Sequence, residues 1–333
     1  MAILTPLTFD EIERCARTFG ITPTKATGVL AGSVNTNFDI VDGHGARWFL
    51  RVYEEQDIAG ATRDARLLGR LAASGVRTPS PRERVDGAGF VGTFRGKAIC
   101  LFPYVVGVHR CQASVAPPDV HAVGSALAAM HRVGEGFDVS EGLTVASRFS
   151  LDALVQRLTS LDERSLTREI RRAREQLLAR LDELSKFVPA SRPLPLVHGD
   201  LFRDNVLFDE DGRPTLLDFE SASIGFAAYD LAVTILAWTF GDHLDASLVS
   251  SLVAGYERTR PLGRDEIADL PSFAAMACVR FATTRITDYE LRPRGSGAYK
   301  DYRRWLSRLE AVDRSFGLRG ADLDSTLRDI WPK

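Results

Sequence analysis

One stretch of the sequence, residues 195–230, constrains this chain more than any other. It contains His198-Gly199-Asp200, an asparagine five residues after that aspartate (Asn205), and an aspartate thirteen residues after the asparagine (Asp218). Between Asn205 and Asp218, two short apolar runs flank the turn residues 209–212, a pattern that predicts a β-hairpin. Because a tight hairpin returns on itself, we expect Asp218 to come back close to Asn205.

These polar residues suit the transfer of a phosphoryl group. That reaction needs a carboxylate to orient the attacking hydroxyl, and oxygen ligands to hold Mg²⁺ on the phosphates. The Asp-x-x-x-x-Asn spacing matches that of a kinase catalytic loop. We therefore predict Asp200 as the catalytic carboxylate and Asn205 and Asp218 as ligands of Mg²⁺. The alternative, an acidic hairpin without a shared site, requires all of these spacings to coincide by chance.

The segments HGDLFRDNVLF and LLDFE resemble the aminoglycoside phosphotransferase/choline kinase superfamily. This resemblance implies an α+β, two-lobed, protein-kinase-like fold. The expected N-lobe, residues 1–103, has a small antiparallel β-sheet, one main helix and the nucleotide-binding role. The expected C-lobe, residues 104–333, is larger and mostly helical, and it carries the catalytic loop, the metal site and the substrate pocket.

Several segments spread along the chain are similar to bacterial homoserine kinases of this fold. They are GSVNTNF (residues 32–38), GSALAAMH followed by Gly136-Phe137, YDLA (229–232) followed by Trp238, and two downstream segments, GYERTRPL (255–262) and RFATTRITD (280–288). The resemblance implies ATP and Mg²⁺ as cofactors and the phosphorylation of L-homoserine to O-phospho-L-homoserine. Choline, ethanolamine or an aminoglycoside as acceptor stays open at this point, as does a regulatory pseudokinase. The pseudokinase is disfavoured because Asp200, Asn205 and Asp218 are all present.

The N-terminal part offers residues for ATP. Small residues between two predicted strands allow backbone N–H groups to approach phosphates, so Gly32, Ser33, Asn35 and Asn37 are candidates. No Gly-Lys-Ser/Thr follows, which excludes a Walker loop. A plain hairpin turn is the alternative for this segment.

A cation lies inside an apolar strand at Arg51, where it needs a partner. Kinase folds place a lysine at this point, between ATP and an acidic residue of the next helix. That helix is predicted over residues 58–74, and Asp64 is its candidate partner for Arg51. The alternative is a surface cation on an edge strand.

Adenine is expected at a hinge after the apolar run 97–104, against the backbone of Pro103, Tyr104 and Val105.

The predicted helices after Leu231 supply candidates for the substrate. Homoserine carries an ammonium, which Glu220 can face, and a carboxylate, which Arg280 or Arg285 can bind in a forked geometry. These arginines are five residues apart on one helix, so we expect only one of them to serve. The alternative for each is a structural ion pair. His131 and Asp230 are also interpreted as structural.

Composition excludes other classes of function. Net charge is −2 with both signs interspersed, which disfavours nucleic acid as a partner. No apolar run is long enough to span a membrane, and the N-terminus lacks the pattern of a signal peptide. The four cysteines are scattered, without metal-ligand spacing. We therefore expect a cytoplasmic protein that needs no obligate protein partner, and the resemblance to homoserine kinases implies a small amino-acid substrate.

Overall fold

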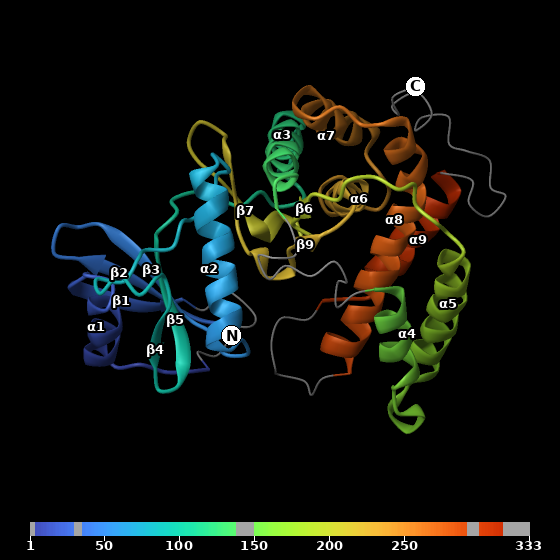
Figure 1. Cartoon of the computed structure of the whole chain (residues 1–333). Coiled ribbons are helices and arrows are strands. Elements are labelled where there is room, and N and C mark those ends of the chain that lie inside the picture. Colours follow the sequence, from blue (N-terminus) through green and yellow to red (C-terminus); the bar gives the residue numbers. More distant parts are fainter. Residues whose placement is uncertain (1–3, 30–34, 138–149, 292–299, 316–333) are drawn as a thin grey trace. The chain divides into compact units, whose positions relative to one another are not determined.

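The computed structural model describes residues 4–29, 35–137, 150–291 and 300–315. The chain forms two compact units, whose elements are labelled in Figure 1. Unit 1 comprises the described residues of Met1–Val108 together with Thr215–Glu220. Unit 2 comprises those of His109–Pro214, Ser221–Arg294 and Tyr299–Lys333. Unit 1 thus runs past residue 103, the boundary expected from sequence, and includes a short segment of the hairpin.

Unit 1 contains an antiparallel sheet of five strands in the order β1-β2-β3-β5-β4. Its strands are β1 (Pro23–Val29), β2 (Thr36–Asp42), β3 (Arg47–Val52), β4 (Gly92–Phe94) and β5 (Lys97–Pro103). The Asp42 carboxylate stabilises the turn after β2. One carboxylate oxygen accepts N–H groups of His44 and Ala46, and the other accepts the indole N–H of Trp48.

Two helices belong to unit 1, α1 (Phe9–Arg17) and α2 (Ile58–Ala73). α1 begins with a capping box, in which the Thr8 side chain and the Glu11 carboxylate each accept the other residue's backbone N–H. α2 is capped by Asp57, which accepts the Gly60 N–H at 2.7 Å. Apolar residues of α1 and the sheet form one core: Ile12, Cys15, Ala16, Phe19, Ile21, Phe38, Ile40, Leu50, Val52, Ile99 and Leu101.

Unit 2 is mainly helical. Its helices are α3 (Pro117–Gly134), α4 (Leu151–Thr159), α5 (Arg168–Ser185), α6 (Ala227–Trp238), α7 (Ala246–Thr259), α8 (Arg264–Arg285) and α9 (Arg303–Ser315). α6 is buried on nearly all sides, as its apolar sequence predicts. α8 packs against α5, α6 and α9 (Figure 1).

Short strands carry the hairpin region. β6 (Leu196–Val197) pairs antiparallel with β9 (Ser223–Ile224), and β7 (Val206–Phe208) forms a two-stranded sheet with β8 (Pro214–Leu216). The predicted hairpin is thus present, with a turn in which the Asp209 side chain accepts the Asp211 and Arg213 N–H groups. The expected α+β class is confirmed. None of the described helices combines the length and apolarity needed to cross a membrane.

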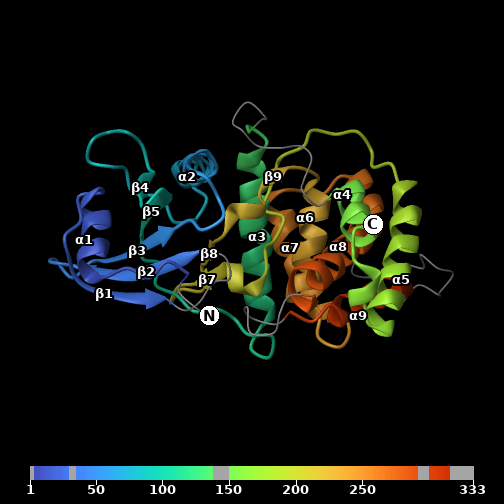
Figure 2. The same ribbon diagram turned by 90° about the horizontal axis from the view of Figure 1, so that it is seen from below.

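Two glycines allow α3 and α7 to cross closely, and Figures 1 and 2 both show these helices side by side. A Cβ atom on Gly124 would lie 2.1 Å from the Leu252 carbonyl oxygen. A Cβ atom on Gly255 would lie 2.0 Å from the His121 carbonyl oxygen. Because backbone atoms occupy both positions, neither contact can be relieved by a side-chain rotation.

Gly255→Ala is therefore expected to destabilise the protein by about 1–3 kcal/mol, since the helices must separate. The matched control is Gly69→Ala in α2, whose new Cβ would meet only the Phe90 ring at 3.8 Å. That change is expected to stabilise by roughly 0.5–1 kcal/mol, because alanine favours helix. Urea denaturation measures both values. Equal effects of the two changes would contradict the close crossing.

Candidate active site

The loop between β6 and β7 carries Asp200 and Asn205. Gly199 has φ +75°, and a Cβ there would lie 2.9 Å from the Ser221 carbonyl oxygen, so glycine is required. The Asn205 amide nitrogen donates to the Asp200 carbonyl oxygen at 2.7 Å. Within the described part of the chain, the Asn205 amide oxygen accepts no hydrogen bond, which suits a metal ligand.

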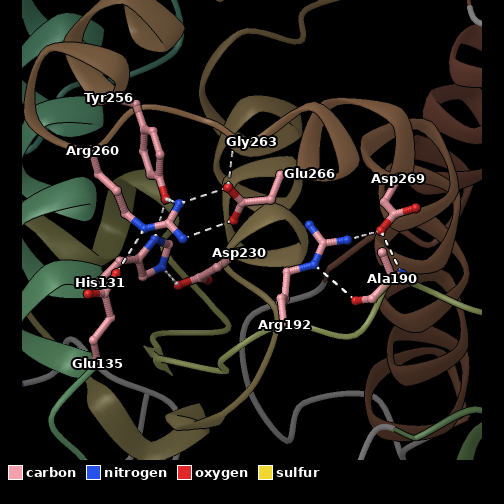
Figure 3. Close-up of polar contacts among 10 residues, drawn as sticks. All are labelled: His131, Glu135, Ala190, Arg192, Asp230, Tyr256, Arg260, Gly263, Glu266 and Asp269. Carbon is pink, nitrogen blue, oxygen red and sulfur yellow. Dashed lines mark hydrogen bonds and ion pairs between the residues drawn. The ribbon is translucent and has the colours of Figure 1, made fainter.

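A buried carboxylate on α6 fixes the backbone of this loop. Asp230 accepts the N–H groups of His198 at 2.6 Å and Gly199 at 2.8 Å. Its third contact is with His131 of α3, whose Nε2 lies 3.0 Å from the same oxygen that His198 contacts (Figure 3). Burial raises the pKa of Asp230, but the hydrogen bonds from His131 and His198 outweigh burial and hold that pKa below its usual range. Asp230 is thus a buried acceptor that positions the loop, in agreement with the structural role expected for it and for His131.

The network continues from His131 to two further helices, as Figure 3 shows. The Tyr256 hydroxyl of α7 lies 2.7 Å from His131 Nδ1 and accepts from the Arg260 guanidinium at 3.2 Å. Arg260 forms an ion pair at 3.0 Å with Glu266, which also accepts the Gly263 N–H at the start of α8. Three helices are thereby linked to the loop that carries Asp200.

Arg280 of α8 also contacts this loop, through a backbone carbonyl group. Its guanidinium donates to the Gly199 carbonyl oxygen at 2.5 Å and to the Tyr229 hydroxyl at 3.1 Å. The side chain is buried, with 4% of the residue exposed. The sequence predicted Arg280 as a ligand of the substrate carboxylate, whereas in the structure it contacts the loop backbone. Arg285 makes a different contact, donating to the Asp301 carbonyl oxygen at 2.9 Å.

Asp218 belongs to unit 1 and has a strained backbone, with φ +61° in the left-handed region that non-glycine residues avoid. Its carboxylate is exposed and forms no hydrogen bond with the described residues. No group of three or more His, Cys, Asp and Glu side chains gathers as a metal site in the described ranges. Mg²⁺ in kinases takes only one or two protein carboxylates alongside substrate oxygens, so the available oxygens of Asp218 fit this ion.

Arg51 lies on β3, which pairs with β2 and β5 and is therefore an interior strand. The edge-strand alternative for Arg51 is thus wrong. Its guanidinium is 3.7 Å from the Glu220 carboxylate, and it donates weakly to the Asn37 side chain at 3.4 Å. Asn35 also donates to Glu220, at 2.6 Å. The sequence predicted Glu220 as a ligand of the substrate ammonium, whereas in the structure its carboxylate contacts Arg51 and Asn35 of unit 1.

The expected partner of Arg51, Asp64, does not form an ion pair with it. Asp64 is half-buried, and burial raises the pKa of its carboxyl group against the hydrogen bond from Gln56 and the charge of Arg51, which lower it. Burial, and next the charge of Asp218, raise the pKa of Glu220 to about 7. Unit 1 therefore holds Asp64, Asp218 and Glu220 around one guanidinium, that of Arg51.

The remaining nucleotide candidates are placed only in part. Gly32 and Ser33 lie outside the described residues. Pro103 ends β5, and the Tyr104 N–H donates to the Arg47 carbonyl oxygen at 3.0 Å. Val105 makes no backbone hydrogen bond with any described residue, so both of its backbone groups are available to a ligand.

Comparison with known proteins identifies the family. Residues 25–270 match the model of the phosphotransferase enzyme family. The homoserine kinase of Sinorhizobium fredii is 31% identical over 317 residues, covering 93% of this chain and 94% of that protein. The homoserine kinase of a Bradyrhizobium species is 31% identical over 333 residues, covering 96% and 99% of the two chains.

Solved structures show the same fold at low sequence identity. A microcompartment-associated aminopropanol kinase has a TM-score of 0.69 and 20% identity, covering 95% of this chain and all of that one (100%). Amicoumacin kinase, solved in complex with AMP-PNP, Ca²⁺ and Ami, has a TM-score of 0.68 and 16% identity, with 96% of each chain covered. The expected kinase-like fold is confirmed. The chain therefore belongs to the phosphotransferase enzyme family, and it is a small-molecule kinase similar to the bacterial homoserine kinases of that family.

Proposed function

We propose that this enzyme transfers the γ-phosphoryl group of ATP, in the presence of Mg²⁺, to the side-chain hydroxyl of L-homoserine. The observation that carries the proposal is similarity over nearly the full length to several homoserine kinases. The loop geometry supports the chemistry, because Asp230 and Arg280 fix the backbone on both sides of Gly199, next to Asp200.

In this proposal Asp200 orients the hydroxyl of homoserine and accepts its proton as the oxygen attacks the γ-phosphorus. The bond between the γ-phosphorus and the bridging oxygen breaks, and ADP leaves. Positioning of the reacting groups accounts for most of the catalysis of phosphoryl transfer. A rigid backbone around Gly199 therefore favours the reaction, because it fixes the position of Asp200.

The Asn205 amide oxygen and the Asp218 carboxylate would hold Mg²⁺, which when bound neutralises the charge on the phosphates. The motif spacing supports this pairing, and so does the availability of both groups in the described residues. Arg51 is proposed to contact the phosphates, and Glu220 to keep its guanidinium in place. The backbone at Pro103, Tyr104 and Val105 is proposed to bind adenine.

A panel of acceptors tests the substrate. Purified protein is given ATP and Mg²⁺ with L-homoserine, choline, ethanolamine, 3-amino-1-propanol or kanamycin, and ADP release is measured. We expect kcat/KM for L-homoserine to exceed that for each of the other acceptors by roughly 100-fold or more. An acceptor without a carboxylate leaves the protein groups that bind the carboxylate unpaired. Phosphorus NMR should identify a phosphate monoester on the hydroxyl. A higher kcat/KM for choline or kanamycin would overturn the assignment.

A further inference from the structure

A cluster of four arginines in unit 2 has no carboxylate partner. Its members are Arg203, Arg285, Arg304 and Arg308, and none forms an ion pair with any described residue. Other arginines of the same unit are neutralised. Arg303, directly before Arg304, contacts Glu169, Glu290 and Asp301, and the buried Arg180 contacts Glu183 and Asp313. The missing counter-charge therefore distinguishes this cluster from Arg180 and Arg303.

Two of these arginines have a structural explanation. Arg203 donates to the Ala237 carbonyl oxygen at 2.6 Å, and Arg308 donates to the Leu236 carbonyl oxygen at 3.1 Å. Both carbonyls belong to the last turn of α6, where the helix dipole favours a cation. Arg203 and Arg308 thus serve the helix end while still contributing positive charge.

Arg285 and Arg304 have no such explanation. Within the described ranges, each makes one side-chain hydrogen bond to a neutral acceptor, Arg285 to the Asp301 carbonyl oxygen at 2.9 Å and Arg304 to the Gln112 side chain at 3.1 Å. A guanidinium carries more N–H donors than one acceptor can use. Arg285 is half-buried and Arg304 is exposed, so both are open to a ligand from solvent.

Electrostatics agrees with the missing counter-charge. Burial, and next the charge of Arg304, lower the pKa of Arg285 to about 10. Burial also lowers the pKa of Arg308 to about 10, against the opposing effect of Cys278, and Arg304, Arg285 and Arg203 lower it further. Like charges this close repel one another, and an anion between them relieves the repulsion.

The cluster lies beside the catalytic loop. Arg203 follows Asp200 by three residues, and the charge of Asp200 acts on Arg285. Three aromatic rings pack together in the same region. The ring centres of Phe202 and Phe281 lie 4.9 Å apart in an edge-to-face contact, and those of Phe281 and Trp305 lie 4.6 Å apart in a stacked one. The guanidinium of Arg285 lies 5.5 Å from the centre of the Trp305 ring. Apolar rings and an uncompensated cation therefore adjoin the residue proposed to orient the acceptor hydroxyl.

We propose that Arg285 and Arg304 form the subsite for the substrate's carboxylate, and that Arg203 and Arg308 add positive potential behind it. This assignment rests on the proposed function, in which the acceptor is an amino acid. A guanidinium binds a carboxylate through two parallel hydrogen bonds, which selects this anion over a neutral group. The subsite therefore determines specificity, while the chemistry stays with Asp200.

The test compares L-homoserine with 3-amino-1-propanol, which keeps the amine, the chain and the hydroxyl and lacks only the carboxylate. In Arg285→Gln and Arg304→Gln, kcat/KM for L-homoserine is expected to fall roughly 10- to 100-fold, mainly through KM. The low activity on 3-amino-1-propanol should stay unchanged. Arg285→Lys should restore part of the loss, because it returns the charge without the fork.

The matched control is Arg303→Gln, which removes a neighbouring arginine that already has carboxylate partners. It should keep the wild-type preference for L-homoserine. Unchanged preference in Arg285→Gln and Arg304→Gln, or an equal loss on both acceptors, would overturn the subsite and leave the proposed function standing. Wild-type protein that fails to phosphorylate L-homoserine would overturn the function and the subsite together.

Discussion

Asp200→Asn is expected to lower kcat for the acceptor by roughly 10²–10⁴-fold, the contribution of a positioned general base. The amide keeps the size of the side chain but cannot accept the proton of the hydroxyl. Because the side chain is only half-buried, stability should change little. The affinity for ADP should also stay close to that of the wild type. A steady-state assay of ADP release and calorimetric titration with ADP measure these two quantities.

The control for Asp200→Asn is Asp211→Asn in the turn of the same hairpin. Asp211 is exposed, and its ion pair with Arg213 lies at 2.6 Å on the surface, where such pairs contribute little. This variant should turn over like the wild type. If Asp200→Asn did so as well, Asp200 could not be the general base. If it lost ADP affinity in parallel with kcat, the residue would act in nucleotide binding.

Local sequence patterns predicted much of the fold. The helix predicted over residues 58–74 is confirmed as α2. The Thr8–Glu11 capping box and the turn after Asp42 likewise depend on residues a few positions apart. The hairpin after Asn205 is present for the same reason. Such features are set by the backbone preferences of neighbouring residues, so a single sequence contains them.

No local sequence pattern indicated the long-range contacts of the site. Glu220 accepts from Asn35 across 185 positions, and Arg280 donates to the Gly199 carbonyl across 81. Nothing in the sequence near Arg280 distinguishes a loop contact from a substrate contact, and the sequence analysis left both arginines of α8 open. Arg303 and Arg304 are identical neighbours, yet only Arg303 has acidic partners. Tertiary packing alone creates that difference.

Asp230→Ala is expected to destabilise the protein by about 3–5 kcal/mol and to abolish activity. The substitution leaves the buried N–H groups of His198 and Gly199 without an acceptor, and it removes the partner of His131 Nε2. Urea denaturation measures the loss. Asp242→Ala provides the control, since Asp242 is exposed and accepts no hydrogen bond from the described residues. A loss as small as that of the control would mean that Asp230 does not hold the loop.

The contribution of Asp230 must also depend on pH in one direction. Its pKa in the folded protein is lower than in the unfolded chain, so the unfolded state binds the proton more readily. The contribution is therefore fully present above about pH 4, the unfolded value, and is lost as pH falls through the folded pKa. The free-energy difference between wild type and Asp230→Asn should thus be constant from neutral pH to about pH 5 and shrink below about pH 4. A difference that grew on acidification would show that the folded protein binds the Asp230 proton more readily than the unfolded chain does, and it would contradict an ionised Asp230 that accepts the N–H groups of His198 and Gly199.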